Sequence, residues 1–237
     1  MGTDPNRNWD NHWCSAAAGG TTDPCSESFC GSAPFSEVEV KAVADYASST
    51  TNIVAFVDFH SYSQLWMQPY GYTSRLPANN DAQSEMGRTA VAALSAINGV
   101  KYKVGPIYTT IYPASGSSAD WAYDNTTHIK FAYGVELRDT GRQGFLLSAD
   151  QIVPSGIETL AAVVAMGDYI IKNPQHMQED QPEIVHFGNM KHFARRSGAA
   201  AGLTQVQEEF EQLELELLSK QPTAAVPTPS LFKKLRD

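Results

Sequence analysis

Two short apolar runs, each with an ionisable side chain at its end, constrain the fold of this 237-residue chain most strongly. Residues 53–59 form a nearly continuous run of β-branched and aromatic side chains, and His60 follows them. Residues 129–137 form a second such run, with Glu136 near its end. Runs of this length are typical of strands covered on both faces, as in a sheet between layers of helices. We therefore predict two strands here, the first of them buried on both faces.

Segments with helical periodicity alternate with these runs. We predict helices over residues 36–48, 80–98 and 156–172, and a short strand over 101–104. The first helix follows Ser36-Glu37-Val38-Glu39, which has the spacing of a capping box, and Gly99 is a natural stop for the second. The apolar positions expected to be buried are Val40, Val43 and Ala47 in the first helix, Met86, Ala90, Leu94 and Ile97 in the second, and Ile157, Leu160, Val164 and Ile171 in the third. The alternation predicts an α/β fold, a mixed β-sheet flanked by helices.

The composition changes after Lys172, so we divide the chain into a main domain, 1–172, and a polar tail, 173–237. Within the tail, residues 203–219 are predicted to form an amphipathic helix, because apolar side chains recur there on one face. The rest of the tail is expected to be a flexible appendage. An alternative is that the helix pairs with a partner or with a second copy of the chain.

Charge and cysteine content narrow the classes of function. Lys and Arg number 17 against 26 Asp and Glu, a net charge of −9, which disfavours binding to nucleic acid or to an anionic membrane surface. No apolar run approaches the roughly 20 residues that span a bilayer, and the N-terminus lacks the features of a signal peptide. Yet three cysteines (Cys14, Cys25 and Cys30) crowd into a Gly/Ser-rich loop, as in secreted proteins, and their odd number leaves at least one thiol unpaired.

His60 and Glu136 are the first candidates for chemistry. Ligands of open α/β sheets gather beyond the carboxyl ends of strands, where both residues are predicted to lie. Imidazole is a common zinc ligand, and a half-buried Glu can act as a general base. Ordinary capping or salt-bridging roles remain the alternative for each residue.

Several strings along the chain carry a more specific signal. In order they are Asp4-Pro5-Asn6-Arg7-Asn8-Trp9, Pro24-Cys25-Ser26-Glu27, Phe35-Ser36-Glu37-Val38-Glu39-Val40, His60-Ser61-Tyr62-Ser63-Gln64, Pro69-Tyr70-Gly71-Tyr72, Thr110-Ile111-Tyr112-Pro113-Ala114-Ser115-Gly116, Asp120-Trp121 and Glu136-Leu137-Arg138-Asp139-Thr140-Gly141-Arg142. This ordered set resembles the carboxypeptidase A/B group of zinc metallocarboxypeptidases. The resemblance covers roughly residues 4–172 and implies that residues 1–172 are part of such a catalytic domain.

The resemblance implies a role for each matching residue. His60 corresponds to the third zinc ligand and Glu136 to the general base that takes a proton from zinc-bound water. Asn6 and Arg7 correspond to the pair that holds the terminal carboxylate of the substrate, a task that suits the planar fork of an arginine. Tyr112 matches the mobile tyrosine that closes over the C-terminal residue, and Tyr62 a subsite tyrosine.

The resemblance also implies a specificity pocket. Ala119 matches the floor of that pocket, where an acid would favour substrates ending in Lys or Arg and an apolar residue favours apolar ones. With Ile111 and Ala114 beside it, and Ile107 and Met67 nearby in the pattern, Ala119 predicts a preference for apolar C-terminal residues. Asp4 matches a carboxylate that orients a ligand histidine, which would lie upstream of Met1.

One part of the family pattern has no counterpart in the sequence. The first two zinc ligands of the family come from a His-x-x-Glu string well before the Asn-Arg-Asn-Trp segment, and so does the arginine that stabilises the oxyanion. We therefore expect an N-terminally truncated domain with one of three zinc ligands and an exposed sheet edge or apolar face. The usual partner of Cys25 would also lie upstream, and a bond between Cys14 and Cys30 is then one hypothesis.

The resulting prediction is a metallocarboxypeptidase that hydrolyses the C-terminal peptide bond of peptides or proteins, with this chain itself inactive. The alternatives are a non-catalytic remnant that binds peptide C-termini and an interaction protein that works through residues 203–219. The family implies an extracellular or vacuolar/secretory location. The oligomeric state is left open.

Overall fold

The computed structural model describes residues 2–177. The tail prediction, with its helix at 203–219, lies largely outside these residues and stays a prediction. The strands are β1 (Ala55–His60), β2 (Leu65–Gln68), β3 (Lys103–Pro106) and β4 (Phe131–Glu136). The helices are α1 (Val38–Ser49), α2 (Asn80–Asn98), α3 (Ile107–Thr110), α4 (Ser118–Asn125) and α5 (Ile152–Lys172), with short 3-10 turns at Pro5–Arg7, Ala16–Ala18, Gly144–Leu146, Ala149–Gln151 and Pro174–Met177.

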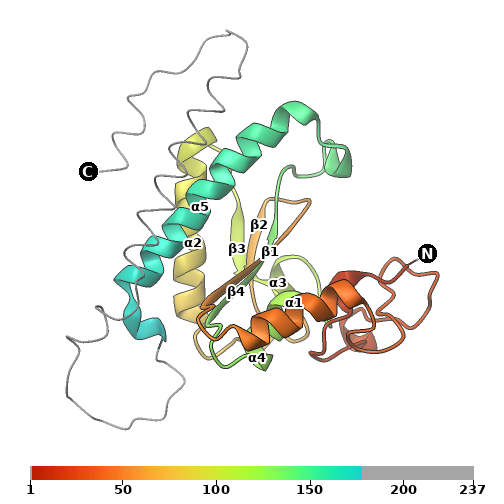
Figure 1. Ribbon diagram of the computed structural model, residues 1–237. Coiled ribbons are helices and arrows are strands. Elements are labelled where there is room, and N and C mark those ends of the chain that lie inside the picture. Colours follow the sequence, from red (N-terminus) through yellow and green to blue (C-terminus); the bar gives the residue numbers. More distant parts are fainter. Residues whose placement is uncertain (1, 178–237) are drawn as a thin grey trace, which may run out of the picture. The chain divides into compact units, whose positions relative to one another are not determined.

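The four strands form one mixed sheet in the order β1-β4-β2-β3 (Figure 1). β1 runs parallel to β4, β4 antiparallel to β2, and β2 parallel to β3. Helices α2 and α5 lie on one side of this sheet, and α1 and α4 on the other (Figure 1). The predicted α/β class with a mixed sheet flanked by helices is therefore confirmed.

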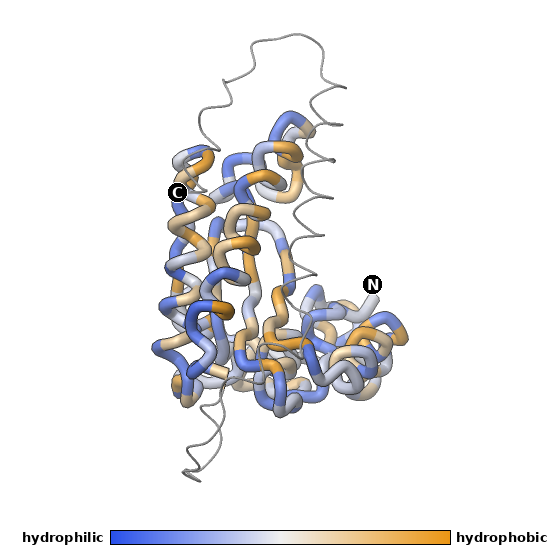
Figure 2. The backbone as a smooth tube through the Cα atoms, turned by 60° about the vertical axis from the view of Figure 1, so that its left-hand side comes forward, coloured by the Kyte–Doolittle hydropathy of each residue, from blue (hydrophilic) through white to orange (hydrophobic). Residues whose placement is uncertain are grey.

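The sheet separates two apolar cores because successive strand residues point to opposite faces. On β4, Phe131, Tyr133 and Val135 pack toward α2 and α5, whereas Ala132 packs toward α1 and α4. Each fully buried side chain of this size contributes about 1.5–3 kcal/mol to stability. Figure 2 shows hydrophobic and hydrophilic segments alternating along the helices, as expected for elements that bury one face.

The burial predicted for the first strand is wrong. β1 is the edge strand of the sheet, paired within the described residues with β4 alone. Its side chains are half-buried or exposed, and Phe59 is 44% exposed. An apolar run reports the character of the side chains, not the presence of a neighbouring strand, so it could not distinguish a central strand from an apolar edge. The position of β1 at the edge of the sheet agrees with the expectation that the sheet has an exposed edge.

Helix α1 differs from its prediction at the cap and on its buried face. Glu37 is the N-cap residue, and its side chain makes no capping hydrogen bond. Instead, the backbone N–H of Glu37 donates to Asn8 Oδ1 at 3.1 Å, so a side chain from the N-terminal segment replaces the predicted capping box. The buried positions are Val40, Ala44 and Ala47, while Val43 is 47% exposed.

Helix α5 begins earlier than predicted and buries a different face. The buried residues are Glu158, Ala162, Met166 and Tyr169, whereas Ile157, Val164 and Ile171 of the predicted stripe are 45%, 58% and 57% exposed. The reason is Glu158, which is fully buried because Arg138 binds its carboxylate through two hydrogen bonds. The predicted stripe assumed that charged residues face solvent, so it could not include Glu158 on the buried face of the helix.

The outward face of α5 borders an apolar groove of about 640 Å³. The groove runs between the exposed Phe59 of β1 and the first half of α5, with Phe145, Ile152 and Val163 among its lining residues.

Helix α2 matches its predicted bounds and ends at Gly99, which has a φ of +73°. No helix of the described part is long and apolar enough to cross a membrane.

Candidate active site

The ends of β1 and β4 bring the two leading candidates together. His60 and Glu136 are register partners at the last position of these parallel strands. Beside them lies a pocket whose lining contains every predicted site residue except Tyr62. Its lining residues are Asn6, Arg7, His60, Met67, Ile107, Ile111, Tyr112, Ala114, Ser117, Ser118, Ala119, Gly134 and Glu136. Tyr62 lies outside this lining and packs edge-on against Phe145, with ring centroids 5.0 Å apart.

The N-terminal segment supplies Asn6 and Arg7 from a tight 3-10 turn, Pro5–Arg7. Asp4 caps the turn, since its Oδ1 accepts the backbone N–H of Asn6 at 2.9 Å. Gly116, with a φ of +66°, lets the chain pass close to this turn, because a Cβ added there would lie 2.4 Å from the carbonyl oxygen of Arg7.

The guanidinium of Arg7 is largely buried but only partly engaged. One N–H donates to the carbonyl oxygen of Asn6 at 2.7 Å, and Asp4 lies 4.0 Å away. The guanidinium carbon lies 6.0 Å from the ring centroid of Tyr112, which is itself 50% exposed. Most of the N–H groups of Arg7 therefore have no partner within residues 2–177, which suits an arginine that binds an external anion.

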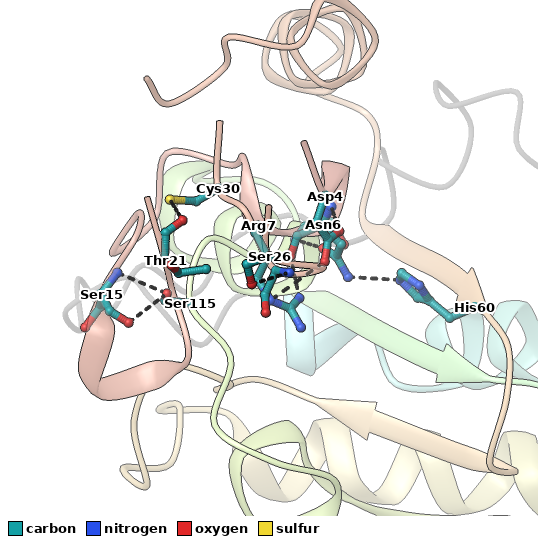
Figure 3. Close-up of polar contacts among 11 residues, drawn as sticks. Asp4, Asn6, Arg7, Ser15, Thr21, Ser26, Cys30, His60 and Ser115 are labelled. Atoms are coloured by element: carbon teal, nitrogen blue, oxygen red, sulfur yellow. Dashed lines mark hydrogen bonds and ion pairs between the residues drawn. The ribbon is translucent and has the colours of Figure 1, made fainter. Parts of the chain in front are cut away.

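His60 contacts an acidic side chain that the sequence analysis missed. Asp58 Oδ2 lies 2.9 Å from His60 Nε2, and the hydroxyl of Ser118 donates to the same carboxylate. Asn6 Nδ2 also lies near His60 Nε2, at 3.0 Å, as Figure 3 shows for the facing side chains of Asn6 and His60. A lone acid two residues before His60, in a run that is otherwise apolar, was the available signal.

His60 and Asp58 shift each other's pKa values. The hydrogen bond to Asp58 raises the pKa of His60 against the opposing effect of burial, and the nearby Glu136 and Asp4 act in the same direction as Asp58. Burial acts to raise the pKa of Asp58, but the hydrogen bond and charge of His60 outweigh it, and the net pKa is lowered.

Glu136 has the properties of a proton acceptor. Burial raises its pKa, while the charge of His60 opposes the rise. Its Oε2 is buried and has no hydrogen-bond partner among the described residues. A buried carboxylate oxygen without a partner costs free energy, so a group from a ligand or from water is expected to satisfy it.

Apart from Ser117 and Ser118, the remaining lining is apolar. Ala119 and Ala114 are buried, Ile107 and Ile111 line the pocket beside them, and Gly134 of β4 adds no side chain. The loop before α4 ends at Ser117, whose hydroxyl accepts the backbone N–H of Asp120 and caps the helix.

The described residues do not form a zinc site by themselves. Among residues 2–177 no group of three His, Cys, Asp or Glu side chains is placed to hold a metal ion. His60 is the predicted donor, and its Nε2 faces Asp58 and Asn6. The set of three protein ligands that a catalytic zinc usually needs is therefore not met by this part of the chain.

A disulfide organises the loop before α1. Cys14 and Cys30 are bonded, as hypothesised, and Cys25 is a free, exposed thiol. The bond closes the N-terminal loop close to the segment that carries Asn6 and Arg7, because the backbone N–H of Asp4 donates to the carbonyl oxygen of Phe29 at 2.9 Å.

Comparisons with known proteins identify the family of the chain. The family model for zinc carboxypeptidase matches residues 1–162. Carboxypeptidase A4 of Mus musculus is 50% identical over 171 residues, which cover 72% of this chain and 40% of the relative. Carboxypeptidase B of Astacus astacus is 45% identical over 170 residues, covering 71% of this chain and 55% of the relative.

A solved structure extends the likeness to three dimensions. Bovine thrombin-activatable fibrinolysis inhibitor, in complex with tick carboxypeptidase inhibitor, matches with a TM-score of 0.69 and 40% identity over 73% of this chain and 58% of that one. The chain thus spans between 40% and 58% of the length of these three relatives. On the family model and these identities, the chain belongs to the zinc carboxypeptidase family.

Proposed function

We propose that this chain recognises the C-terminal residue of a peptide or protein, as the substrate-binding part of a metallocarboxypeptidase that prefers apolar C-terminal residues. The observation that carries the proposal is the convergence of Arg7, Asn6 and Tyr112 with Glu136 and an apolar floor in one pocket. Each of these features is suited to bind a different part of a C-terminal residue.

The terminal carboxylate is assigned to Arg7 and Asn6. A guanidinium with unengaged N–H groups can bind a carboxylate through two parallel hydrogen bonds. Tyr112 is assigned to cover the bound residue, which its half-exposed position 6.0 Å from that guanidinium supports. The terminal side chain then lies against Ile111, Ala114 and Ala119, where burial of apolar surface favours an apolar residue.

Glu136 is assigned the role of general base, and His60 that of a metal ligand. The raised pKa and the unpartnered oxygen of Glu136 support the first assignment. Because the described residues do not complete a zinc site, we expect the 237-residue chain to bind such peptides without hydrolysing them. The disulfide supports an extracellular or secretory location.

Calorimetric titration of the purified chain with a peptide ending in Phe tests the proposal. We expect binding to weaken at least tenfold when the peptide carboxylate is amidated, and likewise when Arg7→Ala is introduced, because a charge-assisted hydrogen bond is lost. Arg88→Ala, an exposed arginine on α2, is the matched control and should change nothing. Equal affinity for the acid and the amide would contradict the proposal.

Release of free Phe, measured in the same samples, tests the expected lack of hydrolysis. Hydrolysis that disappears in Glu136→Ala would contradict that expectation and support the assigned role of Glu136. Absence of hydrolysis alongside selective binding of the acid is the result we expect.

A further inference from the structure

The end of α4 carries a sequence motif that the proposed function does not use. Asn125-Thr126-Thr127 has the form Asn-x-Ser/Thr, with x other than Pro, and is the only such triplet in the 237 residues. In secreted proteins an oligosaccharide is attached to the asparagine of this triplet, which then lies at the surface. Because such triplets also arise by chance, the surroundings of Asn125 have to be compatible with an attached glycan.

Both residues that define the triplet face solvent. Asn125 is the last residue of α4 and is exposed, and Thr127 is exposed as well. Between them Thr126 is the C-cap residue, in extended conformation with a φ of −114° and a ψ of 136°, so the chain leaves the helix at this point. An oligosaccharide can therefore be attached here without entering either apolar core.

Thr126, the middle residue, is buried and holds the turn after α4. Its hydroxyl donates to the carbonyl oxygen of Ala122 at 2.6 Å and accepts the backbone N–H of Ile129 at 3.3 Å. These two bonds do not use the side chain of Asn125. Attachment of a sugar to Asn125 therefore leaves both of them intact.

The amide nitrogen of Asn125 has one hydrogen more than its hydrogen bond uses. Nδ2 donates to the carbonyl oxygen of Asp10 at 3.1 Å, and Oδ1 accepts from Asn11 Nδ2 at 3.0 Å. An amide nitrogen carries two hydrogens, and glycosylation replaces one of them. The nitrogen then keeps one N–H for Asp10, and the oxygen keeps its bond to Asn11.

The disulfide provides a second, independent indication of the compartment. A bond such as that between Cys14 and Cys30 forms in an oxidising compartment, and the secretory lumen is also where asparagine is glycosylated. The site is separate from the proposed peptide pocket. Ser118 and Ala119 line that pocket from the first turn of α4, and Asn125 lies at the other end of the helix, about 10 Å along its axis.

We propose that Asn125 is an N-glycosylation site whose co-substrate is an oligosaccharide linked to a lipid diphosphate. The amide nitrogen forms a bond to the anomeric carbon of the first sugar, and the bond from that carbon to the diphosphate oxygen breaks. The amide loses one proton, and the lipid diphosphate leaves. The inference rests on the secretory location put forward with the proposed function.

Production of the full chain in cultured eukaryotic cells, directed to the secretory lumen by an added signal sequence, tests the inference. Mass spectrometry of the medium and of the microsomal fraction should find a glycan at Asn125, and peptide-N-glycosidase should remove it and leave an aspartate in its place. Transfer precedes folding, so chain that the cells retain still reports on the site. Unmodified Asn125 in both fractions would overturn the inference.

Variants of the triplet provide the controls. Asn125→Gln and Thr127→Ala should each abolish the glycan, whereas Thr127→Ser, which keeps a hydroxyl, should retain it. Asn52→Gln, at an exposed asparagine outside any such triplet, is the matched control and should change nothing. A glycan that persists in Asn125→Gln would overturn the inference. The measurement uses no peptide ligand, so its failure and a failure of the proposed peptide recognition are separate results.

Discussion

At the residue scale, we expect Ala119 to determine which terminal side chain the pocket accepts. It lies at the start of α4, buried and in the pocket lining, where an acidic side chain is tolerated by the helix N-terminus. We expect Ala119→Asp to shift the ratio of affinities for peptides ending in Lys and in Phe at least tenfold toward Lys, because a charge-assisted hydrogen bond is gained. Ala119→Asn, of equal size without charge, is the control in a competition titration and should weaken both peptides without reversing the preference.

Asp120, the next residue, predicts a dependence of stability on pH. Burial raises its pKa to about 7, against the N–H groups of Gly71 and Tyr72 that donate to its carboxylate. Between an unfolded pKa of about 3.9 and this value, the folded state holds the extra proton, so stability falls as pH rises, by at most about 1.4 kcal/mol per pH unit.

Urea unfolding of the native chain and of Asp120→Asn, at a series of pH values, isolates this group. The stability of the native chain relative to the variant should decrease from about pH 4 to about pH 7 and then level off. A difference that does not change with pH would show that the buried carboxyl is ionised throughout.

At the scale of elements, the loop before α4 is matched closely to the turn that carries Arg7. A side chain at Gly116 would meet the carbonyl oxygen of Arg7 and would adopt a φ of +66°. We expect Gly116→Ala to cost about 1–3 kcal/mol in unfolding free energy and to weaken peptide binding, because Arg7 must move.

Gly156→Ala is the matched control for that substitution. Gly156 lies in α5, where an added Cβ meets nothing within 4 Å, so the change should stabilise the chain by up to about 1 kcal/mol. Denaturant midpoints and peptide titrations of the two variants provide the comparison. Loss of binding in both would point away from the contact with Arg7.

The elements also show what the sequence could predict. The bounds of α2 and the existence of α1 and α5 followed from apolar residues at helical spacing, and the existence of β1 and β4 followed from nearly continuous apolar runs. The inner face of α5 could not be predicted, since it depends on the pairing of Glu158 with Arg138, residues 20 positions apart that form an ion pair. The contact of Asp58 with Ser118 could not be predicted, because it joins residues 60 positions apart, although a lone acid in an apolar run was a local signal for Asp58 itself. The pocket residues were found through the family resemblance rather than through periodicity.

At the scale of the molecule, the disulfide holds the N-terminal segment in a compact loop. It joins residues 16 positions apart, and the loss of such a closed loop costs about 3 kcal/mol. We therefore expect Cys14→Ser to lower the unfolding free energy by about that amount in urea. Cys25→Ser, at the exposed free thiol, should leave it unchanged, and an equal loss in both variants would contradict the pairing.

The groove between Phe59 and α5 has a practical consequence at the bench. Fluorescent dyes that brighten on apolar surfaces, such as ANS, are usually taken to report loosened, partly unfolded protein. In this chain the native fold itself offers such a surface, with Phe145 79% and Ile152 69% exposed. The folded chain should therefore increase the fluorescence of the dye before any heating. Thermal unfolding curves recorded with the dye would then start from a high fluorescence. Circular dichroism, which reports the helices directly, is the method suited to every stability comparison made on this protein.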